Sequence, residues 1–214
     1  MSVRLVAVAF EARDPARLAE YWAGLLAGAE TPVGVRFFPG EAAQPGPNRL
    51  HLHLTSDSDA HQRETVARAL DLGGRHLDVG QRPEEGHVVL ADPEGNAFCV
   101  IEPGNAYLAG CGFLGEVACD GTREVGLFWS AALGWPLVWD RDGETAVQSP
   151  SGGTKVAWSG TAPVRGQGRR QRFELVTTGD AAAAADRLVA LGATRLGGDL
   201  LADPDGQEFR LLPG

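Results

Sequence analysis

Two histidines that alternate with leucines are the residues best placed to do chemistry. His51 and His53 lie in residues 49–55, where three leucines occupy the intervening positions. Because successive side chains of a β-strand point to opposite faces, this alternation predicts a strand with both imidazoles on one face. Imidazole is the natural proton-transfer group at neutral pH. We therefore take His51 as the candidate catalytic base, and a structural or solvated histidine is the alternative.

Five further residues are candidates for contact with a ligand. Cys99 carries a thiol, although no positively charged neighbour in the sequence activates it as a nucleophile, and apolar packing is its alternative role. Trp139 and Trp158 offer large flat surfaces to a planar ligand, with core packing as the alternative. Arg172 or Arg210 would add a charge or stack on a ring. With the two histidines, these residues form the candidate ligand-binding set.

A four-residue turn that occurs twice shows how the chain is organised. Asp-Pro-Glu-Gly at residues 92–95 recurs as Asp-Pro-Asp-Gly at residues 203–206, and a phenylalanine follows each copy, as Phe98 and Phe209. The offset of 111 residues, from 92 to 203, is about half of the 214-residue chain. A fixed internal repeat predicts one folding unit written twice. We therefore predict two domains, residues 1–106 and 107–214, with a linker near residues 105–112.

Each half is predicted to contain the same order of strands and helices. Asp14 and Pro15 are typical of a helix start, and apolar residues follow at helical spacing, with Trp22 in the first half and Trp129 in the second. Helices are predicted to begin near residues 14, 58, 122 and 180. Strands are predicted at residues 3–10, 33–38, 49–55, 76–78, 87–91, 97–102, 113–119, 137–139, 145–148, 154–158 and 172–177.

Composition and charge argue against several classes of protein. The net charge of −9 disfavours a general partner of nucleic acid or of anionic membranes, since both repel an acidic surface. No apolar stretch approaches the roughly 20 residues that cross a bilayer, and no export signal is visible. The three cysteines lack a spacing such as Cys-x-x-Cys, so we expect reduced thiols in a cytoplasmic protein. The arginine-rich residues 165–172 are expected in a solvated loop.

The order of these motifs, repeated twice, resembles the vicinal oxygen chelate superfamily, which includes glyoxalase I, bleomycin-resistance proteins and extradiol dioxygenases. The resemblance depends on the aromatic pairs at residues 21–22 and 128–129, the Arg-Leu-His-Leu strand at residues 49–52 and the Asp-Pro-acidic-Gly hairpins. It implies an α+β fold, in which four βαβββ modules form two tandem glyoxalase-like domains with curved mixed sheets. It also implies that each half curls its own sheet into a cup around a small-molecule site.

Many members of the superfamily hold a divalent metal, and the resemblance implies where its ligands would fall in this chain. The first half offers His51, whereas the second half has arginines, which cannot ligate a cation. We therefore expect no essential metal cofactor, and a divalent metal bound through His51 is the alternative. The implied ligand positions are Ala7, His51 and Cys99 in the first half, and Leu114, Arg172 and Arg210 in the second.

The sequence favours a small-molecule-binding protein of the glyoxalase or bleomycin-resistance type, whose ligand is an apolar or aromatic metabolite. The alternative is a lyase, isomerase or dioxygenase that uses His51 as base or metal ligand. A third class is a structural or dimerising protein in which both cups are filled. Monomer and homodimer are equally compatible with the sequence.

Overall fold

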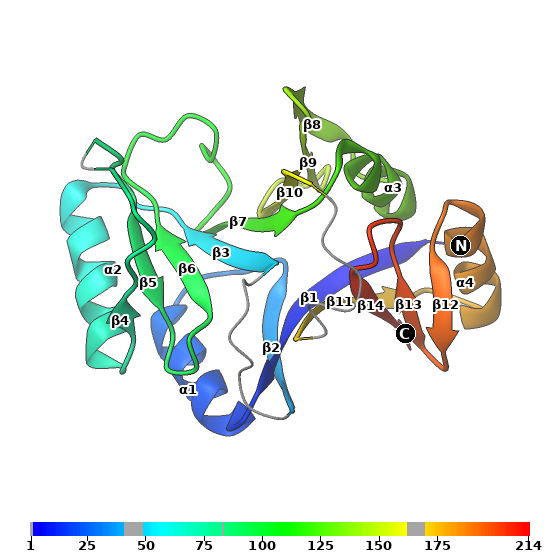
Figure 1. Ribbon diagram of the computed structural model, residues 1–214, viewed down its shortest axis with the longest axis horizontal. Helices are drawn as coiled ribbons and strands as arrows, with labels where there is room; N and C mark the ends of the chain where they lie inside the picture. The colour runs from blue at the N-terminus through cyan, green and yellow to red at the C-terminus, as the bar shows by residue number, and fades with distance from the viewer. Residues whose placement is uncertain (1, 41–48, 83, 162–169) are drawn as a thin grey trace.

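The computed structural model describes residues 2–40, 49–82, 84–161 and 170–214, which form two sheets and four helices (Figure 1). The helices are α1 (Pro15–Leu25), α2 (Asp59–Asp71), α3 (Arg123–Leu133) and α4 (Ala181–Ala190). The strands are β1 (Val3–Ala12), β2 (Gly34–Pro39), β3 (Leu50–Leu54), β4 (Arg75–His76), β5 (Val88–Ala91), β6 (Ala97–Val100), β7 (Leu114–Asp120), β8 (Leu137–Arg141), β9 (Glu144–Gln148), β10 (Lys155–Ser159), β11 (Gln171–Thr177), β12 (Thr194–Gly197), β13 (Leu200–Ala202) and β14 (Glu208–Pro213). Most of the arginine-rich loop predicted at residues 165–172 lies outside the described residues.

Helix α1 forms where its capping and apolar residues predict it. The Asp14 side chain accepts a hydrogen bond from the backbone N–H of Arg17, and Pro15 occupies the first turn, where a backbone N–H has no helical partner. Trp22 lies on the buried face of α1, and Trp129 takes the same place in α3. The predicted correspondence between the first helices of the two halves is confirmed.

The strands form two mixed sheets, as expected for an α+β fold. Sheet A has six strands in the order β12-β13-β14-β11-β1-β2, and sheet B has eight in the order β4-β5-β6-β3-β7-β10-β9-β8. Helix α2 contacts β4 and β6, α3 contacts β8, β9 and β10, and α4 contacts β14. Figure 1 shows α2 and α4 at opposite ends of the molecule, with the strands between them.

The two halves of the chain share both sheets. Strand β1 of the first half pairs antiparallel with β11 of the second half in sheet A, and β3 pairs antiparallel with β7 in sheet B. The expectation that each half curls its own sheet into a cup is therefore wrong. The linker leads from β6 into β7, which lies beside β3 in sheet B, and β1 of the first module pairs with β11 of the last module in sheet A. That residues 1–106 and 107–214 are separate domains stays a prediction.

Each sheet has a core face and an opposite face, which we call the cup face. Residues directly opposite one another on paired strands share a face, so His53 lies with Glu116, and His51 with Ala118. The three leucines between and beside the histidines belong to the hydrophobic core, where residues of the helices also pack. The predicted alternation is confirmed, and both imidazoles lie on the cup face of sheet B.

The repeated Asp-Pro turn anchors a helix in each half. The indole Nε1 of Trp22 donates to Asp92 Oδ2 at 3.1 Å, and Nε1 of Trp129 donates to Asp203 Oδ2 at 2.9 Å. The Oδ1 atom of each aspartate accepts two backbone N–H groups of its own turn. The repeat in the sequence therefore corresponds to a repeated contact, in which the first aspartate of the turn binds the tryptophan of the first helix.

Candidate functional site in the cup of sheet B

The cup face of sheet B surrounds a cavity of about 230 Å³. Strands β3, β7, β8, β9 and β10 and the linker between the halves contribute to its lining. The cavity therefore combines residues from both halves of the chain. Among its lining residues are His51, His53, Tyr107, Glu116, Trp139 and Trp158.

A buried ion pair forms the polar floor of this cavity. His53 Nδ1 lies 2.6 Å from Glu116 Oε2, and the two side chains are only 18% and 6% exposed. The Tyr107 hydroxyl donates to the other carboxylate oxygen of Glu116 at 2.8 Å. Burial alone would lower the pKa of His53, but hydrogen bonds to Cys99 and Glu116 and their charges outweigh burial and raise it to about 9. His53 is therefore protonated at neutral pH.

Glu116 is held as a carboxylate by the same contacts. Burial by itself would raise the pKa of Glu116, but the hydrogen bond and charge of His53 lower it below its ordinary value, with a further contribution from the Tyr107 hydroxyl. Burial and Glu116 in turn raise the pKa of Tyr107, so its hydroxyl keeps its proton. The three side chains form a satisfied network with fixed protonation states.

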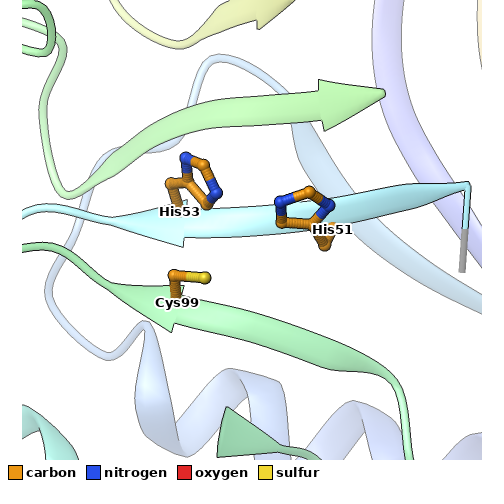
Figure 2. A group of neighbouring side chains, drawn as sticks. All are labelled: His51, His53 and Cys99. Carbon is orange, nitrogen blue, oxygen red and sulfur yellow. The ribbon is translucent and has the colours of Figure 1, made fainter. Parts of the chain in front are cut away.

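His51 is a neutral imidazole beside this network. Its ring centroid lies 4.8 Å from that of His53 on the same strand (Figure 2). Burial, followed by the charge of His53, lowers the pKa of His51 to about 4, although Glu116 opposes the shift. A neutral imidazole offers one N–H donor and one acceptor to a ligand. As a base, His51 is weak, because its pKa lies well below neutral pH.

Three donor side chains on this face have a composition that suits a divalent metal. His51, His53 and Cys99 each offer one ligand atom, and these atoms all lie within 4.8 Å of one another (Figure 2). Two imidazoles and a thiolate are ligands that zinc accepts, with a fourth position open. Glu116 lies at Nδ1 of His53, a common arrangement around metal-bound histidines, and a metal at Nε2 would have to displace the proton that His53 holds in the metal-free protein. The donor set of sheet B therefore fits zinc.

Two aromatic side chains form one wall of the cavity. Tyr107 and Trp139 meet edge to face, with centroids 5.5 Å apart and an interplanar angle of 81°. The Lys155 ammonium lies 4.2 Å from the centre of the Tyr107 ring and also donates to the Tyr107 carbonyl oxygen. The Arg141 guanidinium lies 5.0 Å from the centre of the Trp139 ring. The two cations hold both rings in place, and Trp139 remains partly exposed.

The linker between the halves occupies part of the cup. Leu108 and Cys111 pack against Val89, Cys99 and Ile101 in a small apolar cluster, separate from the main core. All three cysteines of the chain are unpaired thiols, as expected. The packed linker reduces the space beside the histidines, so the cavity admits only a small ligand.

Trp158 borders the cavity, but its ring belongs to the core. The side chain is 2% exposed, and its indole stacks on that of Trp129 with centroids 6.3 Å apart and an interplanar angle of 7°. Lys155 on the same strand lies opposite Glu116, so the alternation of β10 places Trp158 on the core face. The structure thus gives Trp158 the packing role that was the alternative to its predicted ligand contact.

Arg172 and Arg210 lie on the other sheet from the histidines. Their strands, β11 and β14, belong to sheet A. Arg210 Nη2 lies 2.6 Å from Asp199 Oδ2, and Arg172 Nη2 lies 3.8 Å from Glu174 Oε1. The candidate ligand-binding set is therefore divided, with the histidines, the cysteine and the tryptophans on sheet B and the arginines on sheet A.

Glu116 is the main site residue that sequence reasoning missed. The resemblance placed the ligand position of β7 at Leu114, but Leu114 is buried in the core opposite Leu54, whereas Glu116 lies opposite His53. A lone carboxylate inside the apolar residues 114–119 was the signal that could have revealed it. The roles of Tyr107 and Lys155 had no such signal, because they depend on how the linker folds back.

The fold, in which each sheet combines strands from both halves, defines a class of protein built from paired βαβββ modules. Comparison with known protein families supports this class. The sequence matches the family described as a glyoxalase-like domain twice, over residues 7–101 and 116–212. The chain therefore belongs to the glyoxalase-like family of the vicinal oxygen chelate superfamily. A sequence search of curated proteins finds no match.

Solved structures share the fold over almost the whole chain. Glyoxalase I from Zea mays matches with a TM-score of 0.71 and 15% identity, over 99% of this chain and 92% of that one. A putative dioxygenase from Bacillus subtilis matches with a TM-score of 0.61 and 12% identity, over 98% of this chain and 84% of that one. Identities this low establish the common fold alone. Within the described residues, none of the helices combines the length and apolar character that crossing a membrane requires.

Proposed function

We propose that this protein binds a small planar molecule on the cup face of sheet B. The observation that carries the proposal is the cavity of about 230 Å³ between the aromatic wall of Tyr107 and Trp139 and the two histidines. Sites for drug-sized ligands occupy roughly 300–1,000 Å³, so this volume favours a small metabolite. The partly exposed indole of Trp139 offers a flat apolar surface to a ring.

The polar floor supports a ligand that also carries a hydrogen-bonding group. Neutral His51 offers one donor and one acceptor to a ligand, whereas protonated His53 hydrogen-bonds Glu116 and Cys99 and contributes its positive charge to the floor. A carbonyl or hydroxyl oxygen on an aromatic ring would meet these groups while the ring contacts Trp139. The proposed ligand is therefore an aromatic metabolite with an oxygen substituent.

Titration of a panel of aromatic compounds, followed by tryptophan fluorescence, tests this proposal. Binding should change the emission of the wild-type protein, and Trp139→Phe should remove most of that change. His51→Ala should weaken binding about tenfold, because one hydrogen bond to the ligand is lost. Trp135→Phe is the matched control, since Trp135 packs against the core away from the cavity lining. No response across a broad panel contradicts the proposal.

A second candidate function, a metal-assisted lyase, isomerase or dioxygenase, is favoured by the cluster of His51, His53 and Cys99. Two structurally similar proteins are named as glyoxalase I and as a putative dioxygenase, which supports an enzyme by analogy alone. A bound zinc ion would polarise a ligand oxygen. His51, His53 and Cys99 would hold the ion, and Glu116 would orient the ring of His53.

Elemental analysis of the purified protein separates the two candidates. The enzyme requires about one metal ion per chain, and His51→Ala should remove both the metal and turnover while circular dichroism shows an intact fold. The binding protein retains its ligand response without metal. A metal-loaded wild-type protein whose ligand response disappears on metal removal overturns the first candidate in favour of the second.

A further inference from the structure

A second cavity lies at one end of sheet B, against the linker between the halves, and we call it the linker cavity. Its volume is about 510 Å³, within the roughly 300–1,000 Å³ that ligand sites occupy. Residues that follow β3 and β6, the first part of α2 and residues 104–113 line it. Of the described residues, none lines both this cavity and the cavity of His51. The linker cavity is therefore a separate site.

The linker forms a fixed wall of this cavity. Thr55 after β3 ties it down, since its backbone N–H donates to the Phe113 carbonyl oxygen at 2.9 Å and its hydroxyl donates to that of Gly112 at 2.8 Å. Gly110 and Gly112 have φ of 76° and 79°, a conformation that residues with a side chain rarely adopt. Figure 1 shows the linker as a long loop between β6 and β7. The wall is thus built before any ligand arrives.

Two stacked rings form an accessible aromatic surface in the linker cavity. The rings of His61 and Phe113 have centroids 5.6 Å apart and an interplanar angle of 22°. The backbone N–H of Asp57 donates to His61 Nδ1 at 3.2 Å, which fixes the imidazole beside the phenyl ring. Both rings line the cavity and are partly exposed. A ligand can therefore place an apolar group against them.

The charged side chains of the linker cavity are acidic. Asp57 and Glu102 both line it, whereas no lysine or arginine does so within the described part of the chain. The Asp57 side chain is 94% exposed, and Glu102 is partly exposed. Glu102 Oε1 accepts a hydrogen bond from Asn105 Nδ2 at 3.0 Å, which orients its carboxylate. The cavity therefore offers two reachable negative charges to a ligand.

The N-terminus of α2 borders the cavity and by itself would favour an anion. Its partial positive charge is already met by the chain, because Asp59 occupies the first turn and Asp57 lies just before the helix. The Ser58 hydroxyl oxygen also accepts the backbone N–H of His61 at 3.1 Å. Two aspartates and a capping serine thus serve this helix end, and the carboxylate of Glu102 adds further negative charge to the cavity.

We infer that the linker cavity binds a small organic ammonium ion. The ammonium group would meet the carboxylates of Asp57 and Glu102, while the apolar part of the ligand contacts the ring of Phe113. Each of these three side chains is at least partly exposed, so a ligand can reach all of them. The site shares no lining residue with the cup of sheet B and stands independently of the function proposed there.

Three probes of similar shape and different charge test the inference: benzylamine, whose amine is protonated at neutral pH, benzyl alcohol and sodium benzoate. Amide chemical shifts in two-dimensional NMR spectra, recorded at constant ionic strength, measure binding and locate it. Benzylammonium should shift the amides of Gly104, Gly110 and Gly112 saturably. It should bind about two- to fivefold more tightly than benzyl alcohol, the range of weak exposed ion pairs, and benzoate should bind least.

Charge removal separates an electrostatic contact from a structural effect. The double variant Asp57→Asn with Glu102→Gln should bind benzylammonium and benzyl alcohol about equally, because only the cation loses its partners. A general loss of structure would instead weaken both compounds alike. The control is Glu64→Gln with Asp71→Asn, which removes two exposed charges from α2 outside the cavity lining and should keep the preference for the cation.

A variant that fills the cavity provides an independent check. Ala109 is exposed and lines the linker cavity, so Ala109→Phe adds a ring there without replacing a core residue, and it should reduce the binding of all three probes. Four results overturn the inference: no saturable shifts with benzylammonium, benzoate binding at least as tight, a preference for the cation that survives in the double variant, or unchanged binding in Ala109→Phe. Shifts confined to β8, β9 and β10 also overturn it and place the amine in the cup.

Discussion

His53 and Glu116, whose side chains lie 2.6 Å apart, come from opposite halves of the chain. Strands β3 and β7 place them directly opposite one another. The charge of His53 is therefore balanced only when the two halves share sheet B. A buried cation without its partner is strongly unfavourable, so this contact links the assembly of the fold to the chemistry of the cup.

Replacing Glu116 by glutamine is expected to lower the pKa of His53 from about 9 toward its ordinary value of about 6.5, with the contact to Cys99 remaining. The substitution removes the negative charge while burial continues to disfavour the imidazolium. NMR titration of the His53 ring resonances measures the change. Glu144→Gln, which alters another carboxylate of the cavity lining, should leave the His53 titration in place. A pKa that stays near 9 in Glu116→Gln would show that the ion pair does not determine it.

The free energy of unfolding is expected to fall as the pH rises from about 6.5 to about 9. Because the folded protein holds the His53 proton more tightly than the unfolded chain, the contribution of His53 is complete below the unfolded pKa and is lost as the pH passes the folded one. The loss is at most about 3 kcal/mol. Urea unfolding at a series of pH values measures it. His53→Asn should remove this pH dependence. The control variant His76→Asn, at an exposed site, should retain it. A wild-type free energy of unfolding that does not change between these pH values contradicts the prediction.

The tryptophan–aspartate contacts are expected to stabilise the two halves to a similar extent. Trp22→Phe and Trp129→Phe should each lower the free energy of unfolding by about 1–3 kcal/mol, because a buried aspartate loses an N–H donor. Chemical denaturation measures both variants. The control is Trp135→Phe, whose side chain forms no such contact among the described residues. If all three variants lose the same stability, ring size rather than the hydrogen bond is responsible.

Exhaustive dialysis against a metal chelator is expected to leave ligand binding in the cup of sheet B intact. The proposed contacts come from Trp139, from neutral His51 and from protonated His53, and none of them requires a metal. The fluorescence titration, repeated on chelator-treated protein, measures the outcome. Binding that is lost on treatment and restored by zinc would assign the three donors His51, His53 and Cys99 to a metal centre instead.

Several local features were readable from the sequence because they depend on neighbours along the chain. The alternation of His51 and His53 with leucines predicted which face of β3 they occupy, and the face is confirmed. The two Asp-Pro turns predicted a folding unit that occurs twice. In the structure, the first aspartate of each turn accepts a hydrogen bond from a tryptophan, Trp22 in the first half and Trp129 in the second. The division of the candidate ligands between two sheets was not readable.

The sequence by itself determined the repeated modules, their strands and helices, and the family to which they belong, since turn chemistry and hydrophobic periodicity are local properties. Only the tertiary structure decided which modules share a sheet, and hence that Glu116 meets His53 while Arg172 lies on the other sheet. The physical reason is that strand pairing is a contact between distant segments. The partner of β3 is β7, a strand of the other half, and no residue spacing within one half encodes that choice.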